Sequence, residues 1–500
     1  MPPLPFRRGV LAAALAAIAP VAAAAQASTP PTPPPFVTRA AAAADLEQLF
    51  RTIESVHPDP YTVASRAAIA REREAVLRAL PDSVTRPELY LRFAPLVAML
   101  GDGHTNLNPP SEEWAAANRA GAPILPFRMT VDPVGQLRVS LAAPDAPIRA
   151  GDAVVAIGGT PVAELLDRTM ASLGGELLAW RRRNAAGFLP RHLWMRGVRG
   201  PFEVTVRRDG EPAPLTFRLD GLRLDSLDAL ARAQATARGG AGAPRDLEYR
   251  TLPGRVGYLE FRTMTAAPDD FAPRIAALMR QAVADSIGAL VVDLRRNGGG
   301  NSQLGELLLQ HLTGAPFRMA ARKEWKMSAE YRAMLRARAE QARRQDSVRF
   351  AASNGETELR RLLEGPDGRL IVSESNARVR PRLEPRFDGP VCVLIGPGTF
   401  SSAMMTANAI QDYRLATLIG EETGGVPTSF GEQYSFRLAN SQLPASVSSA
   451  RFVRASGDAS VRAGVVPDIE VRPTAADLRA GRDPVLERAM TCPARPTTRR

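Results

Sequence analysis

The chain has 500 residues, 45% of them hydrophobic and 23% charged, which is the balance of an ordinary soluble globular protein. Its 43 prolines and 39 glycines are too few for a collagen-like or low-complexity chain, and its length predicts roughly two to four domains. The net charge of +12 comes from 64 Lys and Arg residues spread among 52 acidic ones. Because no basic patch with interleaved aromatic residues accompanies it, we interpret this charge as a solvated surface, and nucleic acid is not expected as a partner.

The N-terminus has the pattern of an export signal. Arg7 and Arg8 precede an apolar run over residues 9–25, and small residues follow that run. We expect residues 1–27 to be removed, residues 28–37 to form a Pro-rich linker, and the mature protein to work in a bacterial periplasm or outside the cell. The alternative is that the apolar run stays as an N-terminal anchor. Past it, no apolar stretch approaches the ~20 residues that a membrane-spanning helix needs.

Residues 38–115 are predicted to form an N-terminal helical domain. Leu46 and Leu49 mark one apolar face at helical spacing. A later helix of this segment ends at the glycine turn 101–103, which is a typical C-terminal stop. His104 is the first large side chain beyond that turn.

Residues 116–220 carry short strand patterns separated by glycine turns. The turns at 150–152 and 157–159, followed by a helical stretch, resemble a PDZ-like module, which binds an extended peptide by strand addition. Residues 221–248, rich in Ala, Arg and Gly, are expected to be a linker.

Residues 249–490 alternate strands and helices. Continuous apolar runs such as GALVVDL and VCVLIG are typical of parallel strands that are buried on both faces. The order predicts an α/β domain with a mainly parallel sheet and right-handed crossovers. The arginine-rich stretch 317–385 is expected to be a helical insertion.

The chain contains two cysteines, Cys392 and Cys492. They could pair in an oxidising compartment. The alternative is that Cys392 stays a buried free thiol inside its apolar strand.

Ser401 stands at a special junction of the α/β domain. A buried strand ends, Gly396 and Gly398 turn the chain, and a helix begins at Ser401, where the first helical N–H groups favour an anion. The plain alternative is that Ser401 only caps the helix. An α/β-hydrolase is excluded, because that fold places its histidine after the nucleophile and all four histidines here precede Ser401.

The base for such a serine must be a histidine, because no lysine follows Lys326. His104 lies in a glycine-flanked loop, DGHTNL, whereas His57, His192 and His311 are expected to be structural. The histidines and cysteines lack the spacing of metal ligands, so neither a metal nor another cofactor is expected.

A second glycine-rich turn, Asn297–Gly300, lies between a strand and a helix. It lacks the third glycine of a dinucleotide fingerprint, since Gln303 occupies that place. We therefore interpret it as a turn that exposes backbone N–H groups beside a reactive centre.

These motifs together resemble a known family. Five segments are similar to those of the tail-specific, or C-terminal processing, serine peptidases: VGYLEF, GALVVDLRRNGGG, GPGTFSSAMMTANAIQD, ATLIGEETGG and GVVPDIEV. The nearest branch is the tricorn-like and interphotoreceptor-retinoid-binding-like one. The resemblance spans about residues 249–490, and it implies a core related to the ClpP/crotonase spiral fold and cofactor-free cleavage of peptides.

By this resemblance Ser401 is the nucleophile. The lysine of the processing-peptidase branch would fall at Val426, so the match points to the histidine branch, with His104 as the base. Backbone N–H groups would bind the oxyanion, here those of Gly299 and Ser402, with Gly298 and Gly300 as alternatives to Gly299.

The carboxylate that would orient His104 departs from the family pattern. Members of this branch often carry a glutamate three residues before the glycine of the GVxPD motif, and Val461 occupies that position. Asp458 is the predicted substitute, and Asp102 and Glu432 are its rivals.

The resemblance implies an exported serine peptidase that cleaves peptides or unfolded protein tails by acyl transfer. One alternative is an inactive member that binds apolar ligands or peptides, and another is a scaffold that only captures peptides. The oligomeric state is not predicted.

Overall fold

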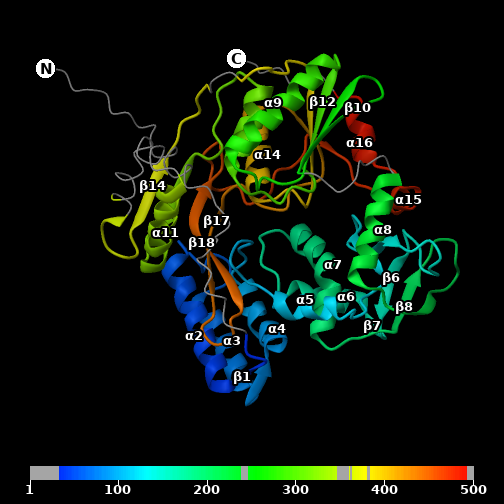
Figure 1. The fold of residues 1–500 in the computed structure, drawn as a ribbon, viewed down its shortest axis with the longest axis vertical. Helices are drawn as coiled ribbons and strands as arrows, with labels where there is room; N and C mark the ends of the chain where they lie inside the picture. Colours follow the sequence, from blue (N-terminus) through cyan, green and yellow to red (C-terminus); the bar gives the residue numbers. More distant parts are fainter. Residues whose placement is uncertain (1–32, 238–245, 346–359, 361–362, 380–382, 493–500) are drawn as a thin grey trace.

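The computed structural model describes residues 33–237, 246–345, 360, 363–379 and 383–492 (Figure 1). The predicted export signal, residues 1–27, lies outside the described residues, as does the first part of the predicted linker 28–37. In the described part of the chain, no helix is long and apolar enough to cross a membrane.

The N-terminal helices lie at the lower left of Figure 1, in blue. The main ones are α2 (Arg39–Val56), α3 (Arg66–Arg78) and α4 (Arg86–Ala98). Each begins after a hydroxyl side chain that accepts a first-turn N–H, namely Thr38, Ser65 and Thr85. Strands β1 (Phe36–Thr38) and β2 (Ser83–Thr85) pair antiparallel just before α2 and α4, and the shorter helix α5 (Ser111–Arg119) follows later.

The core of these helices is completed by a hairpin from the C-terminal part of the chain. Strands β17 (Ser429–Arg437) and β18 (Pro444–Val453) pair antiparallel and extend down between the helices (Figure 1). Leu438 and Leu443, at the tip of this hairpin, are buried in the same cluster as Leu46. The helical segment therefore shares its core with the rest of the chain.

The next unit is rich in β-strands. Its antiparallel sheet has the order β4-β5-β6-β8-β9, with β7 paired to β6. The strands are β4 (Phe127–Val131), β5 (Leu137–Ala142), β6 (Ala153–Ile157), β7 (Thr160–Pro161), β8 (Phe202–Arg207) and β9 (Leu215–Leu219). Helices α6 (Val162–Met170) and α7 (Leu178–Met195) pack into its core, where Phe127, Leu165 and Leu189 are buried together.

The prediction that residues 221–248 form a linker is wrong for the helix α8 (Leu224–Ala237), and residues 238–245 lie outside the described part of the chain. In α8, Leu227 is buried against Ile124 and Leu141. The leucines at 224, 227 and 230 have helical spacing, a signal that the Ala- and Arg-rich composition concealed.

The α/β core occupies the top of Figure 1. Its six-stranded sheet has the order β10-β11-β12-β15-β16-β19, in which β10 is antiparallel to β11 and the other neighbours are parallel. The strands are β10 (Leu247–Leu252), β11 (Val256–Phe261), β12 (Ala289–Asp293), β15 (Val391–Ile395), β16 (Thr417–Gly420) and β19 (Ile469–Glu470). The predicted mixed α/β architecture with a mainly parallel sheet is therefore present.

Helices cover both faces of this sheet. On one face α9 (Pro268–Ala284), α10 (Ser302–Leu312) and α14 (Ser401–Tyr413) enclose the largest core cluster. On the other face α16 (Pro484–Ala489), which follows α15 (Ala475–Ala480), packs against the strands. All five residues of β15 are buried, which explains its continuous apolar sequence.

A disulfide joins Cys392 in β15 to Cys492, just beyond α16. The alternative of a free thiol at Cys392 is therefore wrong, although the side chain is buried as that alternative required.

The predicted helical insertion 317–385 is only partly helical. It contains α11 (Ala329–Gln345), but also the strands β13 (Arg322–Lys326) and β14 (Leu370–Glu374). These strands form a second sheet of order β14-β13-β18-β17, and β3 (Asn106–Leu107) pairs with β18. The charged sequence RKEWK has low strand propensity, and pairing on both sides of β13 outweighs it.

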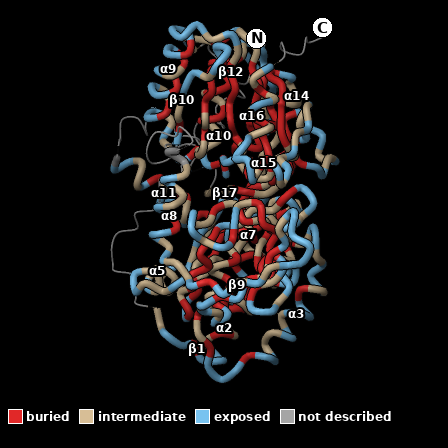
Figure 2. Tube along the Cα trace, turned by 90° about the vertical axis from the view of Figure 1, so that its right-hand side faces the viewer, coloured by how far each residue is buried: buried red, intermediate tan, exposed pale blue. Residues whose placement is uncertain are grey.

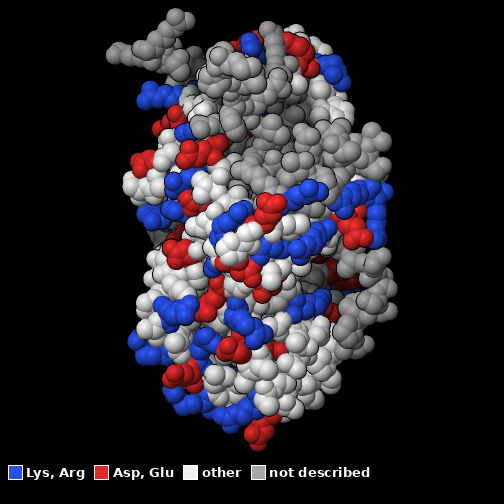
Figure 3. Space-filling model, turned by 90° about the vertical axis from the view of Figure 1, so that its left-hand side faces the viewer, with Lys and Arg blue, Asp and Glu red and all other residues white. Residues whose placement is uncertain are grey.

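Buried residues extend through both halves of the molecule, with β17 between them (Figure 2). On the face shown in Figure 3, Lys and Arg side chains are interspersed with Asp and Glu. This arrangement is typical of a solvated, mixed-charge surface.

Candidate active site

Ser401 and His104 meet at the junction between the α/β core and the second sheet. Ser401 Oγ lies 3.0 Å from His104 Nε2, although the two residues are 297 positions apart in the chain. The distance is that of a hydrogen bond between a serine and the histidine that would take its proton.

Ser401 does not cap its helix, so the plain alternative is wrong. The N-cap of α14 is Phe400, which makes no side-chain cap, and Ser401 is the first helical residue. The turn before it is tight, and Ser401 itself has a positive φ of 50°. A non-glycine residue rarely adopts this conformation, which is concentrated at functional sites.

The ring of His104 is largely enclosed, with 14% of the side chain exposed, and its neighbours control its charge. Burial lowers the pKa of His104, while the negative charge of Asp102 and the backbone carbonyl of Phe430 oppose that shift. The ring stacks on Phe400 with centroids 4.9 Å apart, and Phe400 in turn stacks on Trp180 at 3.9 Å. The imidazole of His104 is therefore mainly uncharged near neutral pH.

The carboxylate beside His104 belongs to Asp102. Its Oδ1 accepts the backbone N–H of His104 at 2.9 Å and lies 3.9 Å from His104 Nδ1. Burial would raise the pKa of Asp102, but the hydrogen bonds that its carboxylate accepts from His57 and Ser448 hold the pKa below its usual range. Asp102 is thus an anion facing the base.

The two other predicted carboxylates are engaged elsewhere. Asp458 is exposed and accepts hydrogen bonds from Ser460, so its choice as the orienting group is a correction. Glu432 accepts hydrogen bonds from Trp325 and Tyr331. Asp458 is near Val461 only in sequence, whereas the fold places the Asp102 carboxylate 3.9 Å from Nδ1 of the His104 ring.

The glycine turn 297–300 lies against Ser401. A Cβ added to Gly299 would stand 2.7 Å from Ser401 Cβ and 2.8 Å from Ser402 N, so only glycine fits there. However, the Gly299 N–H donates to Asn297 Oδ1 at 2.9 Å, and it is therefore not free to bind an oxyanion. This observation corrects the choice of Gly299 as a donor.

The N–H groups of Ser402 and Gly300 are better placed as donors. Neither has a hydrogen-bond partner among the described residues. The Gly299 carbonyl accepts the Met264 N–H at 3.0 Å, so the N–H of Gly300, across the same trans peptide, faces away from Met264. Ser402 Oγ donates to the Gly300 carbonyl at 2.6 Å and fixes the turn against α14.

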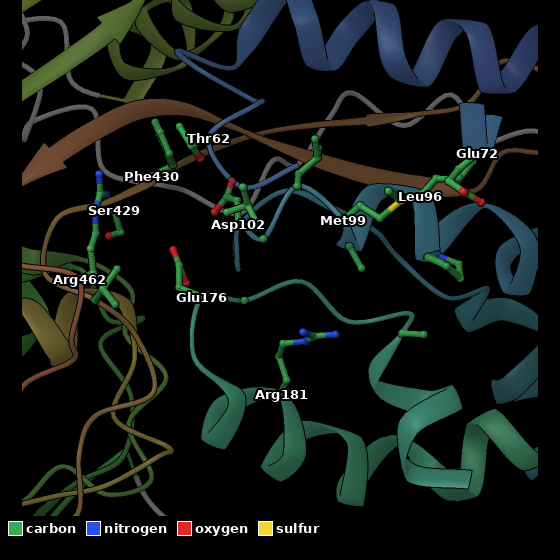
Figure 4. Close-up of a pocket in the computed structure, with 18 of the residues that line it drawn as sticks. Thr62, Glu72, Leu96, Met99, Asp102, Glu176, Arg181, Ser429, Phe430 and Arg462 are labelled. Carbon is green, nitrogen blue, oxygen red and sulfur yellow. The ribbon is translucent and has the colours of Figure 1, made fainter. Parts of the chain in front are cut away.

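A cavity of about 800 Å³ opens beside Asp102 (Figure 4). Its walls come from α4, from the segment between α6 and α7, and from the start of β17, and Figure 4 shows Glu176 pointing toward Asp102. Apolar side chains such as Leu96 and Met99 line its far end, and Arg181 lies across from them.

Glu176 is a feature of the site that the sequence analysis missed. Its Oε2 is buried without a hydrogen-bond partner, and burial together with the charge of Asp102 raises the pKa of Glu176 to about 8. The preceding glycines bring it there: a Cβ on Gly174 would stand 2.4 Å from the Asp102 carbonyl, and Gly175 has a φ of 140°. The pair Gly174–Gly175 directly before a lone acidic residue was the available signal.

The other histidines differ in their surroundings. His192 and His311 both lie in helices. His192 contacts Thr169 Oγ1, and His311 contacts the Pro385 carbonyl. His57, expected to be merely structural, is hydrogen-bonded to Asp102 at 3.2 Å. In the described part of the chain, no group of three or more His, Cys, Asp or Glu residues is placed to hold a metal ion.

Comparison with known proteins agrees with a serine peptidase. The sequence pattern of Peptidase family S41 matches residues 255–471. The crystal structure of a CPAF mutant is 16% identical, covers 88% of this chain and 94% of its own, and superposes with a TM-score of 0.63. Mature CPAF complexed with lactacystin is also 16% identical, with 90% and 98% coverage and a TM-score of 0.58.

A further similar structure is the photosystem II D1 C-terminal processing protease, which is 16% identical, with 86% and 93% coverage and a TM-score of 0.43. At such identities the likeness to CPAF shows a shared fold, and the family assignment rests on the matched domain. Residues 255–471 match the domain of a serine peptidase family, and this match confirms the predicted resemblance for that part of the chain.

Proposed function

We propose that this chain hydrolyses peptide bonds by acyl transfer, with Ser401 as the nucleophile and His104 as the general base. The observation that carries the proposal is the 3.0 Å contact between Ser401 Oγ and His104 Nε2. It is supported by the lowered pKa of His104, which keeps the ring mainly uncharged near neutral pH, and by the anionic Asp102 beside it.

The steps follow from this geometry. His104 Nε2 accepts the proton as Ser401 Oγ attacks the peptide carbonyl, and it then gives that proton to the leaving amine. Water repeats the sequence and releases the acyl group. While His104 is protonated, its positive charge is stabilised by Asp102 and the Phe430 carbonyl, which replaces Asp458 by Asp102 as the proposed orienting carboxylate.

The oxyanion would be bound by the N–H groups of Ser402 and Gly300. Ser402 N belongs to the first turn of α14, where helical N–H groups lack intrahelical partners and the helix dipole favours negative charge. Each such donor is typically worth about 10²–10³ in rate.

The substrate is a peptide or an unfolded protein segment, and the β-rich unit is the proposed place for its tail. A groove of about 460 Å³ lies between the starts of β5 and β6 and the helix α6, with Leu137, Val155 and Leu166 in its walls. Its mainly apolar walls suit the side chains of an extended peptide tail.

We also infer that the protein is exported. The N-terminal signal pattern motivates this inference, and the disulfide between Cys392 and Cys492 supports it, because such bonds persist in oxidising compartments.

The test is labelling by a serine-directed fluorophosphonate together with hydrolysis of a peptide library. The wild type should be labelled and active, and Ser401→Ala should lose both while keeping its unfolding midpoint. Ser402→Ala is the matched control and should be milder, because it keeps the backbone N–H. Labelling that persists in Ser401→Ala would overturn the assignment, and a folded wild type that binds peptides or apolar ligands without labelling would make the chain an inactive binding member.

A further inference from the structure

Asp102 is held by several donors, and one of them comes from the end of helix α2. His57 Nε2 lies 3.2 Å from Asp102 Oδ2, and the two side chains are only 1% and 3% exposed. A buried carboxylate is stable only when donors compensate its lost hydration. His57 is therefore part of the setting that keeps Asp102 anionic.

The second ring nitrogen of His57 determines its tautomer. Nδ1 accepts the backbone N–H of Asp59 at 3.0 Å, so Nδ1 carries no proton. The proton of the neutral ring is then on Nε2, and His57 donates to Asp102. The direction of this hydrogen bond follows from the local turn His57–Asp59 and not from Asp102 itself.

The position of His57 is fixed from three sides. His57 is the C-cap of α2, and its N–H bonds to the Ile53 carbonyl. Lys326 Nζ reaches across from β13 and donates to the carbonyls of Glu54 and His57, at 2.7 and 3.1 Å. The imidazole also packs on Phe430 with ring centroids 4.4 Å apart.

We propose that His57 is a positioning residue for peptide hydrolysis, which fixes the Asp102 carboxylate so that its Oδ1 faces His104. His57, Thr105 and Ser448 all donate to Oδ2, at 3.2, 2.5 and 2.6 Å. Oδ1 is left for His104, whose backbone N–H and ring Nδ1 lie 2.9 and 3.9 Å away. This inference rests on the proposed function, in which Asp102 supports His104.

Two substitutions separate the roles of the two ring nitrogens. The glutamine amide extends about as far as Nε2, whereas the asparagine amide reaches only the position of Nδ1. His57→Gln therefore keeps a donor for Asp102, and His57→Asn keeps only the partner of Asp59. On one peptide substrate, we expect His57→Asn to lower kcat by about 10-fold or more, the effect of losing one hydrogen bond to a charged group. KM should change less than about threefold, and His57→Gln should keep kcat within about threefold.

The same pair of substitutions at His192 is the matched control. His192 is also buried and hydrogen-bonded, to Thr169, but it lies outside the site. His192→Asn and His192→Gln should leave kcat per folded molecule unchanged, with unfolding midpoints measured for all four variants. Equal kcat values for His57→Asn and His57→Gln would overturn the proposal.

A double-mutant cycle keeps the test valid if His57→Gln folds poorly. With Asp102→Asn in place, the carboxylate that His57 positions is gone, so adding His57→Asn should lower kcat by less than about twofold. A full additional 10-fold loss would show that His57 acts otherwise and overturn the proposal. Peptide hydrolysis that persists in Ser401→Ala would instead overturn the proposed function, and the role of His57 with it.

Discussion

At the scale of single residues, the site contains backbone conformations that proteins usually avoid because they cost free energy. Ser401 has a φ of 50°, and the neighbouring turn brings Gly299 so close that a Cβ there would collide with Ser401. Such backbone strain costs about 1–3 kcal/mol and persists only where the surroundings hold it. Here the surroundings are the glycine turn, the Ser402 hydroxyl and the stacked ring of Phe400.

His104 should give the pH–rate profile its acidic limb. Burial lowers the pKa of His104 and Asp102 opposes the shift, so the neutral base stays populated below the ordinary value of about 6.5. We expect kcat/KM to rise with pH through a limb centred below about 6.5 and to be flat around neutrality. Asp102→Asn should lower kcat by about 10-fold or more and move the limb to lower pH, because the charge that raises the pKa of His104 is removed. A limb centred on the alkaline side of neutrality would contradict His104 as the base.

Glu176 should make the protein less stable in alkali. Burial and the charge of Asp102 raise the pKa of Glu176 from its ordinary value of 4.5 to about 8. Between these two pH values, the folded state therefore binds more protons than the unfolded state. The free energy of unfolding therefore falls as the pH rises through this window, by at most about 5 kcal/mol. Glu176→Gln should remove this part of the pH dependence. The unfolding midpoint of the variant should therefore fall less between pH 5 and pH 9 than that of the wild type. Parallel pH–stability curves for the variant and the wild type would show that Glu176 is not buried as described.

At the scale of elements, α7 connects the β-rich unit to the proposed nucleophile, Ser401. Trp180, in its first turn, stacks on Phe400, and Phe400 stacks on His104. A Cβ on Gly424 would stand 2.7 Å from the Trp180 ring, so this ring also packs on the segment after β16. The β-rich unit therefore supports the site in addition to offering a groove, and deleting residues 116–220 would not isolate a binding function.

Single substitutions in this unit should separate support from binding. Trp180→Ala removes the stacked ring, and we expect kcat to fall by about 10-fold on short and long peptides alike. Val155→Arg, in the groove beside α6, should raise KM by about 10-fold for long substrates and leave short peptides unaffected. The comparison needs kcat and KM for both variants on one short peptide and one tailed protein. An equal effect of Val155→Arg on both substrates would exclude the groove as a tail-binding site.

At the scale of the whole molecule, distant parts of the chain complete one another. The hairpin of β17 and β18 closes the core of the N-terminal helices, and the disulfide ties the segment after α16 to the central strand β15. The matched domain, residues 255–471, carries Ser401, whereas His104, Asp102 and Glu176 precede it. The proposed site therefore combines residues of the N-terminal segments with Ser401 of that domain.

Loss of the disulfide should lower stability without changing the chemistry. The bond closes a loop with a sequence separation of 100, for which a chain-entropy estimate is about 4–5 kcal/mol. We expect Cys492→Ser to lower the unfolding midpoint by several degrees while kcat per folded molecule stays within about twofold, since the bond lies on the face of the sheet that carries α16. The measurement is thermal unfolding and peptide hydrolysis of this variant. An unchanged midpoint would mean that the bond does not constrain the chain.

Part of the site was predictable because its signals are local. The glycine turns around Ser401 and Asn297 stand at strand–helix junctions, and the loop DGHTNL sets His104 apart from the helical histidines. Glu176 and His57 could not be predicted in the same way. Their roles depend on burial and on an anion more than forty residues away, and no local pattern records either property.

Hydrophobic periodicity predicted the α/β class, and the resemblance of short motifs to a known family predicted the peptidase domain and the roles of Ser401 and His104, because each of these signals lies within a short stretch of sequence. The tertiary structure decided the rest: Asp102 in place of Asp458, Gly300 in place of Gly299, the strands β13 and β14 in a charged insertion, and the helix α8 in an expected linker. Each of these is a choice among nearly equivalent local candidates. The hydrogen bonds and packing that select one of them, some local and some between distant segments, exist only in the folded chain.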